Sequence, residues 1–166
     1  MVIMVHFVDT TSNAPTVSHV ISGDAGVTGV TSLGDDVFVV RYEIQQVEVY
    51  DAVTFTLQRC LSVPGLGRYS SGLAACASNK CLYASEINKD CVHRVELSGS
   101  NAVTKWSVGR GPAGLTVNSA KNVLVVIKVN SSYWSSRLTE LYYRPFSSSQ
   151  ILRFRDKLSN CPVASL

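Results

Sequence analysis

The sequence predicts an all-β protein, specifically a β-propeller fragment made of four-stranded antiparallel blades. Val supplies 24 of the 166 residues while Met supplies two, and β-branched residues favour strands. Apolar residues make up 46% and charged residues 16%, which excludes a disordered chain. A pattern also recurs with a period of about 43 residues, and such a period is typical of folds that repeat one supersecondary unit.

The repeat is visible in two independent registers. Gly29, Gly72 and Gly114 each open a short apolar segment, and they lie 43 and 42 residues apart. The segment 61–65 before the second unit also resembles 106–109 before the third. A β-sandwich of short strands would show frequent turns but gives no reason for the longer period. The shared period therefore favours a propeller.

The first two strands of each unit are expected to form its inner part. The first strand follows the glycine, and the second is a continuous apolar run, which predicts burial on both of its faces. The expected first strands are 29–33, 72–77 and 114–118, and the expected second strands are 37–40, 81–84 and 123–127.

The outer strands are more polar. The third strands are expected at 47–50 and 91–97, and the fourth strand of the first unit alternates, with Phe55, Leu57 and Leu61 on one face. The outermost strand of a blade is an edge that must resist pairing with other chains, which explains its polarity. Four antiparallel strands in about 43 residues describe one propeller blade.

The repeat defines the expected domain organisation. Residues 1–129 are expected to form a partial propeller, with complete blades at about 26–64 and 70–109 and half a blade at 112–129. Residues 1–23 are expected to supply outer strands of a preceding blade, with 16–22 as the best candidate.

The repeat stops after residue 129. Residues 130–166 are Ser-rich and basic, and we expect them to form an irregular tail rather than a regular blade. Two alternatives stay open for this segment. It can form two strands, at about 138–144 and 151–155, or a helix that Ser148 or Ser149 caps.

About three blades are too few for a closed ring, which needs at least roughly four. The chain is therefore expected to be a fragment of a longer propeller, to complete a ring by oligomerisation, or to form a fourth blade from its tail. Open blade faces would expose apolar surface, which favours self-association.

Two segments resemble the NHL/YVTN group of propeller repeats. Residues 111–117, Gly-Pro-Ala-Gly-Leu-Thr-Val, resemble the Pro-x-Gly-hydrophobic opening of that group, and 88–95, Asn-Lys-Asp-Cys-Val-His-Arg-Val, resemble its Asn-rich turn and basic strand. Residues 45–49 depart from the pattern because they lack the basic residue. The resemblance covers roughly residues 16–129 and implies a propeller.

Cys76, Cys81, Cys91 and His93 raise the question of a zinc site. Their spacing lacks the closely paired ligands that are usual for zinc. Cys76 and Cys81 flank a four-residue turn and are expected to face each other across a hairpin. Cys91 is expected at the far end of the strand that Cys81 begins. We therefore expect free, partly buried thiols and no metal site.

The other ionisable residues form no catalytic pattern in the sequence. No histidine stands in a pattern with a Ser or Cys nucleophile and a carboxylate. Asp24 and the pair 35–36 lie beside glycines, where aspartate typically caps turn amides. Phosphate-binding and dinucleotide-binding motifs are absent from the sequence. We assign no catalytic, cofactor-binding or metal-binding residue and expect no enzyme activity.

These observations favour a non-enzymatic, scaffold-type protein-interaction module whose partner the sequence does not identify. The alternative is a metal-dependent propeller enzyme of the lactonase-like or lyase-like kind, in which Asp36, Glu43 or Glu86 would point at an axial ion. Nucleic acid is not an expected partner, since residues 1–127 carry nine Lys/Arg against ten Asp/Glu. An NHL-type RNA-binding surface, the third possibility, suits this charge poorly.

The start of the sequence gives no targeting signal. Its first eight residues are largely apolar but lack the basic region and the long apolar stretch of a signal peptide. No run approaches the roughly 20 apolar residues that span a bilayer. We therefore expect a cytoplasmic protein without a membrane partner.

Overall fold

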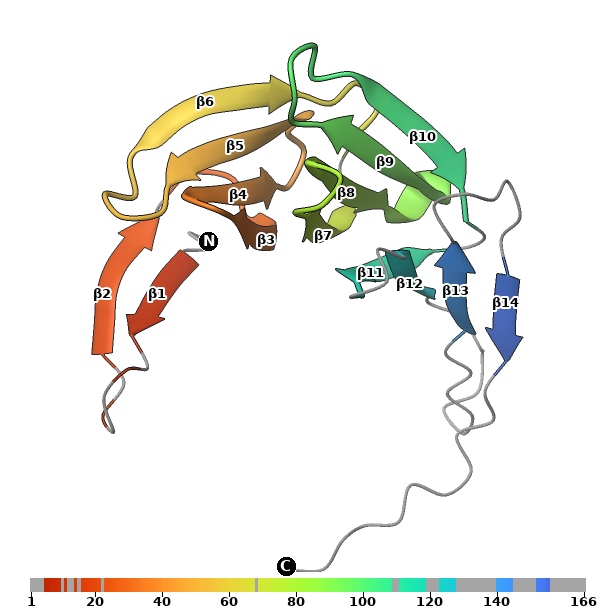
Figure 1. Ribbon diagram of the computed structural model, residues 1–166, viewed down its shortest axis with the longest axis horizontal. Helices are drawn as coiled ribbons and strands as arrows, with labels where there is room; N and C mark the ends of the chain where they lie inside the picture. Colours follow the sequence, from red (N-terminus) through yellow and green to blue (C-terminus); the bar gives the residue numbers. More distant parts are fainter. Residues whose placement is uncertain are drawn as a thin grey trace, which may run out of the picture.

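The computed structural model consists of β-strands in four antiparallel sheets (Figure 1). It describes residues 5–9, 11, 14, 16–21, 23–67, 69–108, 111–118, 123–127, 140–144 and 152–155. The strands are β1 (Val5–Asp9), β2 (Thr16–Ile21), β3 (Val27–Leu33), β4 (Asp36–Arg41), β5 (Gln46–Asp51), β6 (Leu57–Ser62), β7 (Ser70–Cys76), β8 (Cys81–Glu86), β9 (Cys91–Glu96), β10 (Val103–Ser107), β11 (Pro112–Val117), β12 (Val123–Ile127), β13 (Glu140–Arg144) and β14 (Leu152–Arg155). A short 3-10 helix, η1 (Ile87–Lys89), joins β8 to β9.

Three of the sheets have four strands each, in the orders β3-β4-β5-β6, β7-β8-β9-β10 and β11-β12-β13-β14. Figure 1 shows them side by side in an arc, with β3, β7 and β11 on its inner side and β6, β10 and β14 on its outer side. The two complete blades expected at 26–64 and 70–109 coincide with the first two of these sheets.

The third sheet corrects the prediction for the C-terminal part. We expected half a blade at 112–129 and an irregular tail at 130–166, but β13 pairs with β12 and β14 pairs with β13. The two added strands contain Tyr142, Tyr143 and Phe154, and aromatic residues favour strands. Their pairing also satisfies the backbone edge of β12. The open alternative of two strands is therefore the correct one, and the remaining residues of 130–166 lie outside the described part.

The N-terminal strands form a separate two-stranded sheet. The strand expected at 16–22 is present as β2, and it pairs with β1. Val5 and Ile21 of this sheet pack against Val37 and Val39 of β4. The pair β1–β2 therefore covers one face of the first four-stranded sheet.

The second strands of the first two blades, β4 and β8, are buried on both faces, as their apolar runs predict. Phe38 and Val40 of β4 pack in one cluster with Leu82 of the next sheet, whereas Val37 and Val39 pack toward β1 and β2. The side chain of Leu82 is completely buried. The side chain at the equivalent position 124 lies outside the described part of the chain.

The recurring glycine has a steric cause. A Cβ atom on Gly72 would lie 2.9 Å from Ser85 Oγ and 3.0 Å from the backbone N of Leu115, next to Gly114. A Cβ atom on Gly29 would lie 3.1 Å from Leu73 Cβ, next to Gly72. The innermost strands of neighbouring sheets thus approach each other at these glycines, where a side chain has no room. This close approach explains the sequence period.

Candidate interaction face

At one end of the sheets lie the turns between second and third strands and the connections from one blade to the next. It includes residues 42–45 between β4 and β5, residues 63–67 and Tyr69 between β6 and β7, η1 with Asp90, and Val108 and Gly111 after β10. We call this end the linker face. The opposite end carries the turns 34–35, 52–56, 77–80 and 98–102.

The linker face is held by hydrogen bonds that repeat from blade to blade. The N–H of Val63 donates to the carbonyl of Gln45 at 3.0 Å, and the N–H of Val108 donates to that of Asp90 at 3.0 Å. The side chains of Gln45 and Asp90 also accept hydrogen bonds from the connection to the next blade. The N–H of Gly65 donates to Gln45 Oε1 at 3.3 Å, and the N–H of Gly111 donates to Asp90 Oδ1 at 2.8 Å. Two blades therefore present their connections in the same way.

An exposed aromatic pair lies on the linker face at the junction of the first two blades. The rings of Tyr42 and Tyr69 meet edge to face, with centroids 5.8 Å apart. Tyr42 is 36% exposed and Tyr69 is 41% exposed. Such a pair combines a rigid apolar surface with polar hydroxyl groups.

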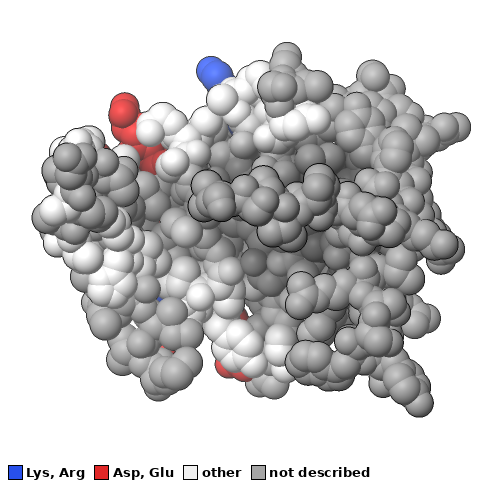
Figure 2. Space-filling view, turned by 90° about the horizontal axis from the view of Figure 1, so that it is seen from below, with Lys and Arg blue, Asp and Glu red and all other residues white. Residues whose placement is uncertain are grey.

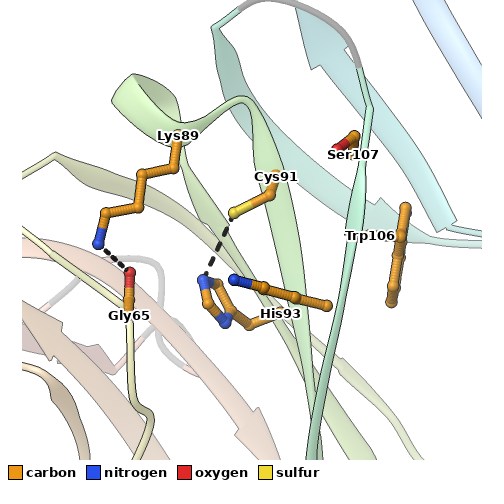
Figure 3. A pocket seen from close by; sticks show the side chains of 7 residues that line it. Gly65, Lys89, Cys91, His93, Trp106 and Ser107 are labelled. Atoms are coloured by element: carbon orange, nitrogen blue, oxygen red, sulfur yellow. Dashed lines mark hydrogen bonds between the residues drawn. The ribbon is translucent and has the colours of Figure 1, made fainter.

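A hollow of about 370 Å³ opens near the same end, between the second blade and the connection that follows β6. Figure 3 shows its walls, with Lys89 reaching the Gly65 carbonyl and Cys91 beside His93. Lys89 Nζ donates to Gly65 O at 2.6 Å. Lys105 and Ser107 of β10 also line it, and they lie opposite His93 and Cys91 in the strand register. Trp106, the seventh lining residue, lies on the other side of β10 from His93.

Cys91 and His93 are not arranged as an activated nucleophile. Cys91 Sγ lies 3.5 Å from His93 Nε2. Burial raises the pKa of the Cys91 thiol, and the Glu86 carboxylate raises it further. Burial lowers the pKa of His93, and the ammonium groups of Lys105 and Lys89 lower it further. The pair is therefore a neutral thiol beside a neutral imidazole, whereas reactive cysteines have a depressed thiol pKa.

The structure places the four residues considered for zinc in two separate places. Cys76 and Cys81 lie directly opposite each other in the β7–β8 pair, as the four-residue turn predicts. Cys91 pairs with Glu86 at the other end of β8. All three thiols are buried and free. Among the described residues no group of three His, Cys, Asp or Glu side chains could hold a metal ion.

The acids considered for an axial metal do not converge. Asp36 forms an ion pair with Arg59 at 2.8 Å at the end of the sheet opposite the linker face. Glu86 is buried and accepts the N–H of Gly67 at 2.5 Å. Glu43 is exposed in the turn after β4. Asp24, considered as a turn cap, is exposed as well.

The inner strands offer few ionisable groups to the centre of the arc. Strands β3, β7 and β11 contain no Asp, Glu, Lys, Arg or His. Figure 2 looks at the concave side of the arc, and the acidic atoms visible in it lie toward the margins. A further ion pair joins the buried Arg41 to the partly buried Glu48 at 2.7 Å. Arg41 also donates to the carbonyl of Ala25, so we interpret this pair as structural.

None of the helices that the structure describes is long and apolar enough to cross a membrane.

Comparison with known proteins supports the fold. No protein-family model matches the sequence, and no curated protein matches it. The structure is similar to a chain of the nidogen/laminin complex, with a TM-score of 0.70 at 9% identity over 95% of this chain and 63% of that chain. It is also similar to Kuenenia stuttgartiensis hydrazine synthase, with a TM-score of 0.62 at 17% identity over 79% of this chain and 36% of that one.

A third neighbour is the Cps50 (Swd1) β-propeller domain of Myceliophteria thermophila, with a TM-score of 0.55 at 15% identity over 78% of this chain and 38% of that domain. The chain therefore has a β-propeller fold of four-stranded antiparallel blades, as the sequence predicts. It spans between 36% and 63% of the length of these three neighbours. The finer resemblance to NHL repeats stays a prediction.

Sequence reasoning did not single out the aromatic pair or the hollow. Tyr42 and Tyr69 are 27 residues apart in the chain, and only the stacking of blades brings them together. Lys105 lies on the same face of the sheet as His93 because the two residues are directly opposite each other in the β9–β10 pair. Pairing the expected third strand of the second unit with a fourth strand could have indicated that these two side chains are neighbours.

Proposed function

We propose that this chain is a non-enzymatic, scaffold-type protein-interaction module that binds its partner through the linker face. The observation that carries the proposal is the exposed pair Tyr42–Tyr69 at the junction of two blades. Tyrosine is enriched among the residues that contribute most to protein–protein binding, and a rigid ring loses little conformational entropy on binding. The repeated hydrogen bonds of Gln45 and Asp90 hold the surrounding connections in place.

A comparison of three immobilised proteins tests this function. The first is the wild-type chain, the second carries Tyr42→Ser with Tyr69→Ser, and the third carries Val53→Ser. Val53 is 80% exposed in a turn at the opposite end of the sheets, so its variant is a matched control. We expect a cellular protein to bind the wild type and the control, and to bind the tyrosine variant roughly tenfold more weakly. Equal binding to all three proteins, with unchanged thermal unfolding, would contradict the proposal.

The metal-dependent enzyme remains the alternative. It requires a divalent ion near the axis, and a ligand that binds only the folded state raises the melting temperature. Under the proposed function, millimolar calcium or zinc leaves the melting temperature unchanged. A rise that saturates with calcium or zinc concentration would favour the enzyme.

We also propose that the chain self-associates through its open blade faces. Val8 and Val17 face each other across the β1–β2 pair and are 50% and 59% exposed, so this sheet presents apolar surface that a second copy can cover. Light scattering of the eluting protein then gives a mass above 18.0 kDa that falls in a Val8→Ser, Val17→Ser variant. A wild-type mass of one chain at all concentrations would contradict this proposal.

A further inference from the structure

The hollow beside His93 is rich in hydrogen-bond donors. Lys89, Lys105 and Ser107 contribute two ammonium groups and a hydroxyl group. The carbonyl of Gly65, another residue that lines the hollow, already accepts from Lys89 at 2.6 Å. A surface of this kind is suited to a group that supplies acceptor oxygens.

Within the described part of the chain, no direct ion pair neutralises the lysines of the hollow. Lys105 forms no ion pair with any residue that the structure describes. The carboxylates of Glu86 and Asp90 lie near Cys91, and they accept the N–H groups of Gly67 and Gly111 rather than form an ion pair with Lys105. The positive charge of Lys105 is therefore available to a ligand.

His93 provides a second and independent observation. Its side chain is 1% exposed, and its Nδ1 is buried without a hydrogen-bond partner. A buried polar atom without a partner is costly, and such atoms often mark a place for a water molecule or a ligand atom. The Cys91 thiol, 3.5 Å from Nε2, occupies the other side of the ring.

We propose that this hollow binds a carboxylate group, namely an Asp or Glu side chain of a protein partner. In this site Lys105 provides the positive charge, and the hydroxyl group of Ser107 donates a hydrogen bond. Nδ1 of His93 forms a hydrogen bond with the carboxylate or with a water molecule that the carboxylate keeps. The nearby Glu86 carboxylate favours a singly charged ligand over a doubly charged phosphate. This inference deepens the proposed function, because the hollow opens near the linker face.

Titration of the full chain with three small probes tests the inference by NMR. The probes are the peptide acetyl-Gly-Glu-Gly-amide, its neutral Gln counterpart and acetate. We expect the Glu peptide to shift the ring signals of His93 saturably, the Gln peptide to cause no saturable shift, and acetate to bind more weakly than the Glu peptide. Lys105→Gln should weaken binding of the Glu peptide roughly tenfold. Lys80→Gln, an exposed lysine in the turn at the opposite end, should leave binding unchanged.

Two kinds of result would contradict this proposal. Equal shifts from the Glu and Gln peptides, or unchanged affinity in Lys105→Gln, would overturn the carboxylate site. Equal affinity for acetate and the Glu peptide would assign the site to a free small carboxylate instead of a polypeptide. The protein-capture experiment depends on Tyr42 and Tyr69, so its outcome is independent of this titration.

Discussion

His93 shows how burial decides the chemistry of a single residue. The sequence places this histidine between Val92 and Arg94 on a mixed strand, which does not reveal its surroundings. In the structure it is fully buried, with Lys89 and Lys105 as its charged neighbours and Cys91 Sγ 3.5 Å from Nε2. Its pKa is lowered by burial first and by the two lysines second. A neutral ring is therefore the stable form in the folded protein.

This shift makes stability depend on pH. In the unfolded chain His93 has an ordinary pKa of about 6.5, whereas its pKa is lower in the folded state. As the pH falls below about 6.5, the unfolded state takes up a proton that the folded state does not, so the free energy of unfolding decreases until the folded pKa is reached. Urea unfolding at several pH values should show this decrease in the wild type and a smaller one in His93→Gln. The exposed His6 provides the control variant His6→Gln, and an equal decrease in wild type and His93→Gln would contradict the account.

Leu82 tests the burial of an inner strand. Because its side chain is completely enclosed between two blades, Leu82→Ala should lower the free energy of unfolding by about 2–5 kcal/mol. Leu57, on the outer strand β6 and 53% exposed, is the control, and Leu57→Ala should change stability by less than about 0.5 kcal/mol. A loss below about 1 kcal/mol for Leu82→Ala would show that β8 is not buried as described.

At the scale of elements, the sequence predicted the strands whose surroundings repeat. The apolar runs 37–40 and 81–84 predicted inner strands, and they correspond to β4 and β8. The strands β13 and β14 were harder to predict because no glycine-led pattern precedes them. Their position is determined by pairing with β12, which is a tertiary effect that local sequence does not contain.

Gly72 tests the contact between elements that explains the repeat. A Cβ atom at this position would press on Ser85 Oγ and on the backbone of Leu115, so Gly72→Ala should destabilise the fold by about 1–3 kcal/mol. Ser85→Ala should also destabilise the fold, because Ser85 Oγ accepts the N–H of Gly72 at 2.8 Å. Thermal or urea unfolding measures both. If Gly72→Ala were as stable as the wild type, the inner strands would not approach as closely as described.

At the scale of the whole molecule, the blades form an arc whose two ends differ. The linker face carries connections held by Gln45 and Asp90, the exposed pair Tyr42–Tyr69 and the nearby donor-rich hollow. The opposite end carries short turns such as 34–35 and 77–80. Composition and period predicted the propeller, but the candidate site arises from residues of different blades. Only the packing of those blades reveals it.

Hydrogen–deuterium exchange of the chain, alone and with the protein captured by the wild type, tests the central claim most directly. If the linker face is the binding surface, the amides of 42–45, 63, 65–67 and 87–90 become protected in the complex. The amides of 34–35, 52–56 and 77–80 then exchange as in the free chain. Protection confined to the second group of turns would contradict the claim and place the interaction at the opposite end of the blades.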